Sequence, residues 1–155
     1  MSARAAGTVS RREALAILAA GAAVLACGRA PREARPVPIA IGRDECAWCR
    51  MPIDNPRLAA EFVPRSGTPA LFGEVGCLLS WRAANPLTPG AEFVTAGDTG
   101  EWLDARQAAY VLGATRTPMY FDITAHAASP AGVPADSIVQ WETLRDRGAP
   151  HARPD

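Results

Sequence analysis

The sequence lacks the features on which most catalytic and nucleic-acid-binding proteins depend. It has no lysine, and its 16 basic residues, all arginine, are balanced by 16 acidic residues to a formal net charge of +0. No basic stripe for nucleic acid is present. There is also no G-x-S-x-G motif, no phosphate-binding glycine loop and no pair of carboxylates beside a histidine. Nucleic-acid binding, nucleotide binding and hydrolysis therefore receive no support.

The sequence also has no apolar run long enough to cross a bilayer as a permanent helix. The longest run, ALAILAAGAAVLA at residues 14–26, follows the pair Arg11-Arg12 and has the length of the apolar part of a secretory signal. The paired arginines and the richness in Ala and Gly favour twin-arginine export over the general route. We therefore expect residues 1–26 to be a signal peptide.

The apolar run ends in VLAC, which is similar to the lipobox of bacterial lipoproteins. Cleavage between Ala26 and Cys27 would leave a thiol and an amine for acyl chains, and two or more chains anchor a protein stably. We expect Cys27 to be lipidated and to hold the protein at the periplasmic face of a membrane in the bacterial cell envelope. The alternative is a soluble periplasmic protein in which Cys27 is lost or spare.

The remaining chain divides by composition. Residues 27–37 are rich in Arg and Pro and are typical of an extended tether. Residues 38–147 can bury one modest core, and residues 148–155 form a polar tail. The patterns within the domain predict an α+β fold with small mixed β-sheet units and one helix, at residues 74–84. Strands are predicted at residues 36–41, 58–63, 67–72, 91–96 and 117–125, with a hairpin joining the second and third.

Two further segments are ambiguous from periodicity alone. Residues 101–112 begin like a short helical turn and end like a strand, AAYVL. Residues 137–147 fit either a strand that runs into a helical turn or a helix.

The pair Cys46 and Cys49, in ECAWCRMP, carries the chemistry of the chain. Haem attachment needs a histidine directly after the second cysteine, and Arg50 stands there. A thioredoxin-like redox pair should open an amphipathic helix, but Pro52 follows after three residues. This disulfide use stays open as an alternative.

A structural zinc site is a second alternative. Zinc usually takes four ligands, often from a second cysteine or histidine pair. Only Cys77, His126 and carboxylates could complete such a site here, and none has the usual paired spacing.

Copper(I) is the metal that the soft residues favour. It prefers thiolate and thioether donors and is stable with two or three of them. Besides the initiator, the chain has two methionines: Met51, two residues after Cys49, and Met119, in RTPMYF. Cys77 lies on the apolar side of the predicted helix, so we expect a buried structural thiol, and His126 lies in loop-like sequence, so we expect a surface position. If Cys27 is lipidated, three cysteines remain, which leaves at least one thiol unpaired or bound to metal.

Four segments in register resemble the NosL family, periplasmic lipoproteins that act as copper chaperones for nitrous-oxide reductase. They are DECAWCRM (44–51), EVGCLLSW (74–81), WLDARQAAYVLG (102–113) and RTPM (116–119). The resemblance implies a monomer of two small ββαβ-like units that binds one Cu(I). Carried over to this chain, Cys46 and Met119 are the first candidate ligands and Cys49 and Met51 the next, with Cys77 and His126 behind them.

The chain departs from the family pattern in three places. Arg50 stands where Gly is common, and Tyr120 follows the second methionine where the family usually has Gly. The stretch AHAASPAGVPAD (125–136) replaces most of a sizeable helix, so we expect an abbreviated second half and a client that can differ from nitrous-oxide reductase.

The sequence therefore predicts a membrane-anchored periplasmic Cu(I) metallochaperone that passes copper to a client cuproprotein by ligand exchange. We expect no enzyme activity, no small-molecule substrate and no nucleic-acid partner. The main alternative is a periplasmic thiol–disulfide oxidoreductase that uses Cys46 and Cys49.

Overall fold

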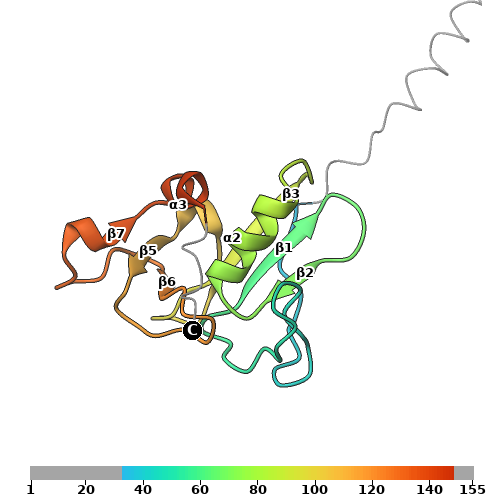
Figure 1. The fold of residues 1–155 in the computed structure, drawn as a ribbon, viewed down its shortest axis with the longest axis horizontal. Helices are drawn as coiled ribbons and strands as arrows, with labels where there is room; N and C mark the ends of the chain where they lie inside the picture. The colour runs from blue at the N-terminus through green and yellow to red at the C-terminus, as the bar shows by residue number, and fades with distance from the viewer. Residues whose placement is uncertain (1–32, 149–155) are drawn as a thin grey trace, which may run out of the picture. The chain divides into compact units, whose positions relative to one another are not determined.

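The structure, a computed structural model, describes residues 33–148, and within them the chain forms two small antiparallel sheets and two α-helices (Figure 1). This confirms the predicted α+β class, although every strand pair among these residues is antiparallel where mixed sheet units were expected. The expected signal peptide, Cys27 and most of the polar tail lie outside the described residues. Neither helix among the described residues is long and apolar enough to span a membrane.

The first sheet has the strand order β2-β1-β3-β4. Its strands are β1 (Ala60–Pro64), β2 (Ala70–Phe72), β3 (Gly90–Thr95) and β4 (Trp102–Asp104). β1 and β3 are the interior strands; in β1, Ala60 pairs with Phe72 on one side and with Val94 on the other. The hairpin of β1 and β2 confirms the predicted pairing.

Helix α2 (Val75–Ala84) connects β2 to β3 and lies across the first sheet (Figure 1). Its first five residues, Val75 to Leu79, are buried, and the helix contacts β1, β2 and β6 of the second sheet. It ends at Asn85 because Pro86 follows, and the residue before a proline is disfavoured in the helical conformation. The helix predicted at residues 74–84 is confirmed.

The second sheet has the order β6-β5-β7. It consists of β5 (Ala109–Leu112), β6 (Ile123–His126) and β7 (Ile138–Val139), and helix α3 (Trp141–Arg147) follows directly. Residues 137–147 are thus a strand that runs into a helix. Between β6 and β7 the structure has only the 3-10 turn η3 (Ala135–Ser137), as expected for an abbreviated second half.

The strand predicted at residues 36–41 is wrong. Pro36 and Pro38 have no N–H to give to a ladder. The N–H of Val37 instead donates to both carboxylate oxygens of the buried Glu61, at 2.9 and 3.1 Å. The segment carries no strand pairing and ends in a turn at residues 41–43.

The strand predicted at residues 117–125 is also wrong in its first part. Tyr120 (φ 59°) and Asp122 (φ 54°) have left-handed backbones, which an extended strand cannot contain. Thr117 and Asp122 close a loop instead, since the backbone N–H of each donates to the side chain of the other at 2.9 Å. Residues 117–122 are called the Met119 loop below. In the ambiguous segment at residues 101–112, the first half is strand β4 followed by the 3-10 turn η2 (Ala105–Gln107), and the second half is strand β5.

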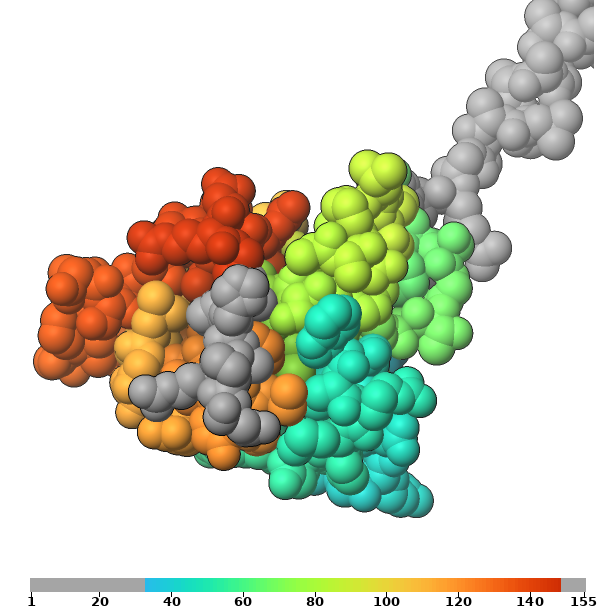
Figure 2. Space-filling model, viewed as in Figure 1, coloured from blue at the N-terminus to red at the C-terminus, as the bar shows by residue number. Residues whose placement is uncertain are grey.

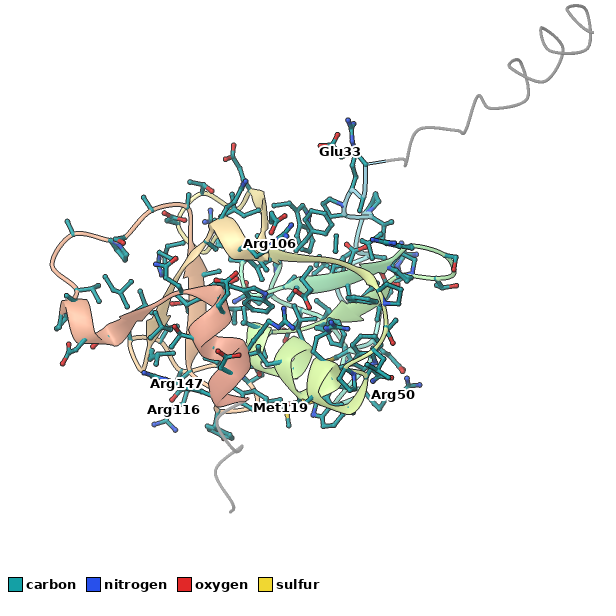
Figure 3. The ribbon with its side chains drawn as sticks, turned by 90° about the horizontal axis from the view of Figure 1, so that it is seen from above. Glu33, Arg50, Arg106, Arg116, Met119 and Arg147 are labelled. Atoms are coloured by element: carbon teal, nitrogen blue, oxygen red, sulfur yellow. The ribbon has the colours of Figure 1, made fainter. Side chains whose placement is uncertain are left out.

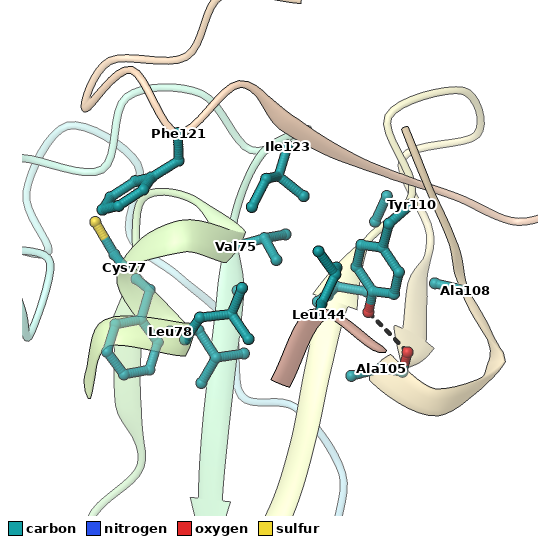
Figure 4. Close-up of a cluster of buried hydrophobic side chains, with 14 of the residues drawn as sticks. Val75, Cys77, Leu78, Ala105, Ala108, Tyr110, Phe121, Ile123 and Leu144 are labelled. Atoms are coloured by element: carbon teal, nitrogen blue, oxygen red, sulfur yellow. Dashed lines mark hydrogen bonds between the residues drawn. The ribbon is translucent and has the colours of Figure 1, made fainter. Parts of the chain in front are cut away.

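The aromatic core joins the two sheets through Tyr110, Trp141 and Glu92. The rings of Tyr110 and Trp141 lie 5.4 Å apart, and both side chains are fully buried. The hydroxyl of Tyr110 donates to the carbonyl of Ala105 at 2.7 Å (Figure 4), and Trp141 Nε1 donates to Glu92 Oε2 at 3.0 Å. Arg82 of α2 forms an ion pair with Glu92 at 2.7 Å, which ties the helix to the same core.

Candidate metal centre

The two cysteines of the sequence motif lie on a closed loop of residues 46–51, called the cysteine loop below. The N–H of Cys46 donates to the carbonyl of Met51 at 2.8 Å, and the N–H of Arg50 donates back to the carbonyl of Cys46 at 3.0 Å. Arg50 has a left-handed backbone (φ 66°), which reverses the chain after Cys49. The N–H of Ala47 donates to the carbonyl of Leu71, so the loop is fixed to β2 just ahead of α2. Figure 2 shows this cyan to teal segment beside α2.

Helix α2 brings a third cysteine to the loop. Cys77 is the third residue of the helix, and its sulfur, with those of Cys46 and Cys49, forms a group in which all lie within 4.8 Å of one another. The three are free thiols. Cys46 and Cys77 are 1% and 0% exposed, and Cys49 is half-buried. These three residues are called the cysteine site below.

The thiols of the cysteine site differ in acidity. A hydrogen bond from the Cys77 side chain lowers the pKa of Cys46 to about 5, helped by the backbone N–H groups of Cys49, Gly73 and Trp48 and opposed by burial. The pKa of Cys77 is raised by the same hydrogen bond and by burial, and that of Cys49 is raised mainly by burial. Cys46 is therefore the most acidic of the three thiols and the one most readily ionised to bind a metal ion.

Met119 is held beside the same part of the core. Its N–H donates to Glu74 Oε1 at 2.6 Å, and Glu74 directly precedes α2. Its side chain is partly buried and packs against the hydrophobic cluster that contains Cys46 and Cys77. In Figure 3, Met119 and Arg50 of the cysteine loop lie toward the same edge of the domain. Met51 lies on the cysteine loop with its side chain 42% exposed.

His126 is not part of this grouping. It is the last residue of β6, opposite Ala109, and its Nε2 lies 3.1 Å from the hydroxyl of Thr124. The group of clustered His, Cys, Asp and Glu side chains found among the described residues contains the three cysteines alone. His126 is half-buried there rather than fully at the surface.

Two residues of the site were not identified from the sequence. Glu74 is 1% exposed and bonds Met119, and Gly76 leaves space for the ring of Phe121, since a Cβ on Gly76 would lie 2.0 Å from Phe121 Cγ. A signal for Glu74 exists: it is the single charged residue between Arg65 and Arg82. A lone carboxyl group in an apolar segment is costly to bury unless it is hydrogen-bonded, so it should have suggested a specific partner.

The donor set fits a soft metal ion. Metal–thiolate bonds of about 2.3 Å, the length known for zinc, place two sulfur ligands of one ion at most about 4.6 Å apart. The sulfurs of the cysteine site, within 4.8 Å, are already near this spacing. Three sulfur donors satisfy Cu(I), whereas zinc would need a fourth ligand.

One solved structure matches this fold: the crystal structure of the copper chaperone NosL from Shewanella denitrificans. The match has a TM-score of 0.52 and covers 75% of this chain and 90% of the NosL chain, at 16% sequence identity. The fold is similar to that of NosL. This confirms the fold that the four motifs implied. No protein-family model and no curated protein matches the sequence.

Proposed function

We propose that this protein binds one Cu(I) ion at the cysteine site and passes it to a client cuproprotein. The observation that carries the proposal is the meeting of three free thiols, within 4.8 Å of one another, in a fold similar to that of NosL. Thiolate and thioether sulfur are the donors that Cu(I) prefers, and this corner of the molecule offers both.

The ligands divide into an inner and an outer set. Cys46 and Cys77 are buried, so they retain the ion, and Met119 adds a thioether from the opposite loop. Cys49 and Met51 are partly exposed, so an approaching protein reaches them first. Transfer is ligand exchange: a client sulfur or imidazole bonds to copper as one of the outer copper–sulfur bonds breaks. Copper stays Cu(I), no substrate bond is made or broken, and the protein is not an enzyme.

The location follows from the parts of the chain outside the described residues. Residues 1–26 direct export, the lipid on Cys27 anchors the protein, and residues 27–37 tether the domain at the periplasmic face of the membrane. The client is an extracytoplasmic cuproenzyme, and the NosL resemblance of the four motifs makes nitrous-oxide reductase the first one to test.

Competition for copper tests the proposal. Full-length protein, reduced and in mild detergent, is titrated against a Cu(I) complex of bathocuproine disulfonate. We expect one Cu(I) per chain. Loss of a group that only orients a metal ligand costs roughly 10–100-fold in metal affinity. Cys46→Ser should weaken Cu(I) binding by more than this, because it removes a ligand itself. Met51→Leu is the matched control for Met119→Leu, and Met119→Leu should cost more. Failure of the wild type to compete, or equal binding by Cys46→Ser, would overturn the proposal.

The oxidoreductase alternative gains no support from the geometry. A redox pair of the thioredoxin type opens a helix, and residues 50–59 of the described chain contain none. Cys46 is also only 1% exposed, out of reach of a protein disulfide. We expect no turnover in an insulin-reduction assay. Metal analysis of protein purified from the periplasm separates copper from the zinc alternative.

A further inference from the structure

Glu74 occupies the position before helix α2 but does not cap it. A short side chain such as Asp or Ser at this position normally accepts a hydrogen bond from the first helical N–H groups, and a negative charge there is favoured by the helix dipole. The side chain of Glu74 makes no capping bond. The residue is nevertheless buried, at 1% exposed.

The partner of this carboxylate lies 45 residues along the chain. Glu74 Oε1 accepts the N–H of Met119 at 2.6 Å. The side chain of Thr117, at the start of the Met119 loop, also interacts with this carboxyl group, and burial raises the pKa of Glu74. Burying a carboxyl group costs stability even when it is hydrogen-bonded, and such costs are concentrated at functional sites.

The backbone of Glu74 serves the cysteine site at the same time. Its carbonyl accepts the N–H of Cys77 at 3.1 Å, which forms the first turn of α2. One residue therefore joins the turn that carries Cys77 to the loop that carries Met119.

Phe121 adds a second contact between the same two segments. Its ring packs on Gly76, where a Cβ would lie 2.0 Å from the ring, and Figure 4 shows it next to the sulfur of Cys77. The contact fixes where the Met119 loop meets α2, and the hydrogen bond of Glu74 fixes the backbone of Met119 itself.

We propose that Glu74 is a positioning residue that holds Met119 at the cysteine site and thereby sets the affinity for Cu(I). The inference rests on the proposed function for the copper readout. Glu74 acts through Met119 and is not itself a ligand.

The test compares Glu74→Leu, Glu74→Gln and Glu61→Gln. Leu has a similar size but no acceptor, whereas Gln retains the Oε1 acceptor. Glu61 is the matched control, because it is an equally buried glutamate that accepts the backbone N–H of Val37. In metal-free protein, amide hydrogen exchange at Met119 should be at least about ten-fold faster in Glu74→Leu, near wild type in Glu74→Gln and no faster than wild type in Glu61→Gln.

Copper affinity gives the second readout. Glu74→Leu should weaken Cu(I) binding by about 10–100-fold, as does the loss of other groups that orient a metal ligand. Glu74→Gln should retain most of the wild-type affinity. In a Met119→Leu background, Glu74→Leu should cost little more, because both changes remove the same ligand. Additive losses, or a Met119 amide that stays protected in Glu74→Leu, would overturn the inference.

Failure of the wild type to bind Cu(I), and failure of Glu74→Leu to fold, can each be separated from failure of this inference. If the wild type binds no Cu(I), the proposed function fails, while the exchange data still decide whether Glu74 holds Met119. If Glu74→Leu does not fold, the scalar coupling across the hydrogen bond from Met119 N–H to the Glu74 carboxylate is measured in the wild type. Its presence supports the inference and its absence overturns it.

Discussion

The cysteine site and the aromatic core differ in how their buried polar and sulfur atoms are partnered. In the aromatic core, the buried hydroxyl of Tyr110 and the ring N–H of Trp141 each have a hydrogen-bond acceptor. At the cysteine site, three thiols stay free of disulfide bonds. The aromatic core pairs its buried polar side chains with protein partners, whereas the cysteine site keeps its sulfur atoms available for a ligand.

The backbone shows the same difference. The non-glycine residues with positive φ in the described chain are Arg50, Tyr120 and Asp122. All three lie on the cysteine loop or the Met119 loop, and none lies in the aromatic core. Strained backbone persists only where the surrounding structure enforces it, and it is concentrated at functional sites. The aromatic core stabilises the fold, and this stability offsets the cost of the strained loops that hold the sulfur atoms in place.

The largest expected effect separates the two regions by stability. Trp141→Ala should lower the free energy of unfolding by about 3–5 kcal/mol, because it removes a fully buried ring and the N–H donor of Glu92 Oε2. Trp48→Ala, on the exposed side of the cysteine loop, should cost less than about 1 kcal/mol. Urea denaturation of metal-free protein measures both. Equal costs would remove the distinction between the regions.

The second effect concerns a buried carboxyl group away from the cysteines. Burial raises the pKa of Glu61 to about 7 from the ordinary 4.5, against the two hydrogen bonds from Val37. The folded state therefore binds the proton more tightly than the unfolded state, and the stability that this gives is full below pH 4.5 and is lost as the pH rises through about 7.

Glu61→Gln should remove that pH dependence. Between pH 4.5 and pH 7.5, the variant should gain about 2–3 kcal/mol relative to the wild type. Urea denaturation across this range measures it, and parallel curves for the two proteins would contradict it.

A third effect tests the contact between α2 and the Met119 loop. Gly76→Ala should destabilise the protein by about 1–3 kcal/mol, because the new methyl group overlaps the ring of Phe121. Helix propensity alone predicts that Gly76→Ala stabilises the protein by about 1 kcal/mol. The sign of the change in the free energy of unfolding therefore shows whether the contact with Phe121 dominates. Ser80→Ala, one turn later on the same helix, should change stability by less than about 1 kcal/mol.

The smallest effect concerns the two left-handed positions where the NosL family commonly has glycine. Arg50→Gly and Tyr120→Gly should each stabilise the metal-free protein by about 0.5–1 kcal/mol, since glycine adopts positive φ without the cost that a side chain brings. Arg50→Ala is the control, because it loses the exposed ion pair with Glu45 but keeps the strain. Thermal unfolding measures the three variants, and a gain for Arg50→Ala equal to that of Arg50→Gly would contradict the account.

The elements with a clear pattern were predicted from the sequence. The hairpin of β1 and β2 and the helix α2 follow from local periodicity and from Pro86. Residues 36–41 and 117–122 were misassigned because their apolar alternation resembles a strand, while side chains decide their structure. The carboxylate of Glu61 takes the N–H of Val37, and Thr117 and Asp122 close the Met119 loop. Such partners far along the chain are not visible to a periodicity argument.

The candidate site was predicted in part for the same reason. Cys77 was expected to be a buried thiol, and it is buried. The buried side of α2 also faces the cysteine loop, which the sequence could not show, so its sulfur joins those of Cys46 and Cys49. The role of Glu74 depends on a contact with Met119, 45 residues away, that only the folded structure reveals.

The most direct test of the central claim is X-ray absorption at the copper edge on the Cu(I)-loaded, full-length protein. The account predicts a nearest shell made of sulfur, with copper–sulfur distances of about 2.3 Å, and a shell that loses sulfur in Cys46→Ser. A shell of nitrogen and oxygen alone, or a sulfur shell that Cys46→Ser leaves unchanged, would contradict the assignment of copper to the cysteine site.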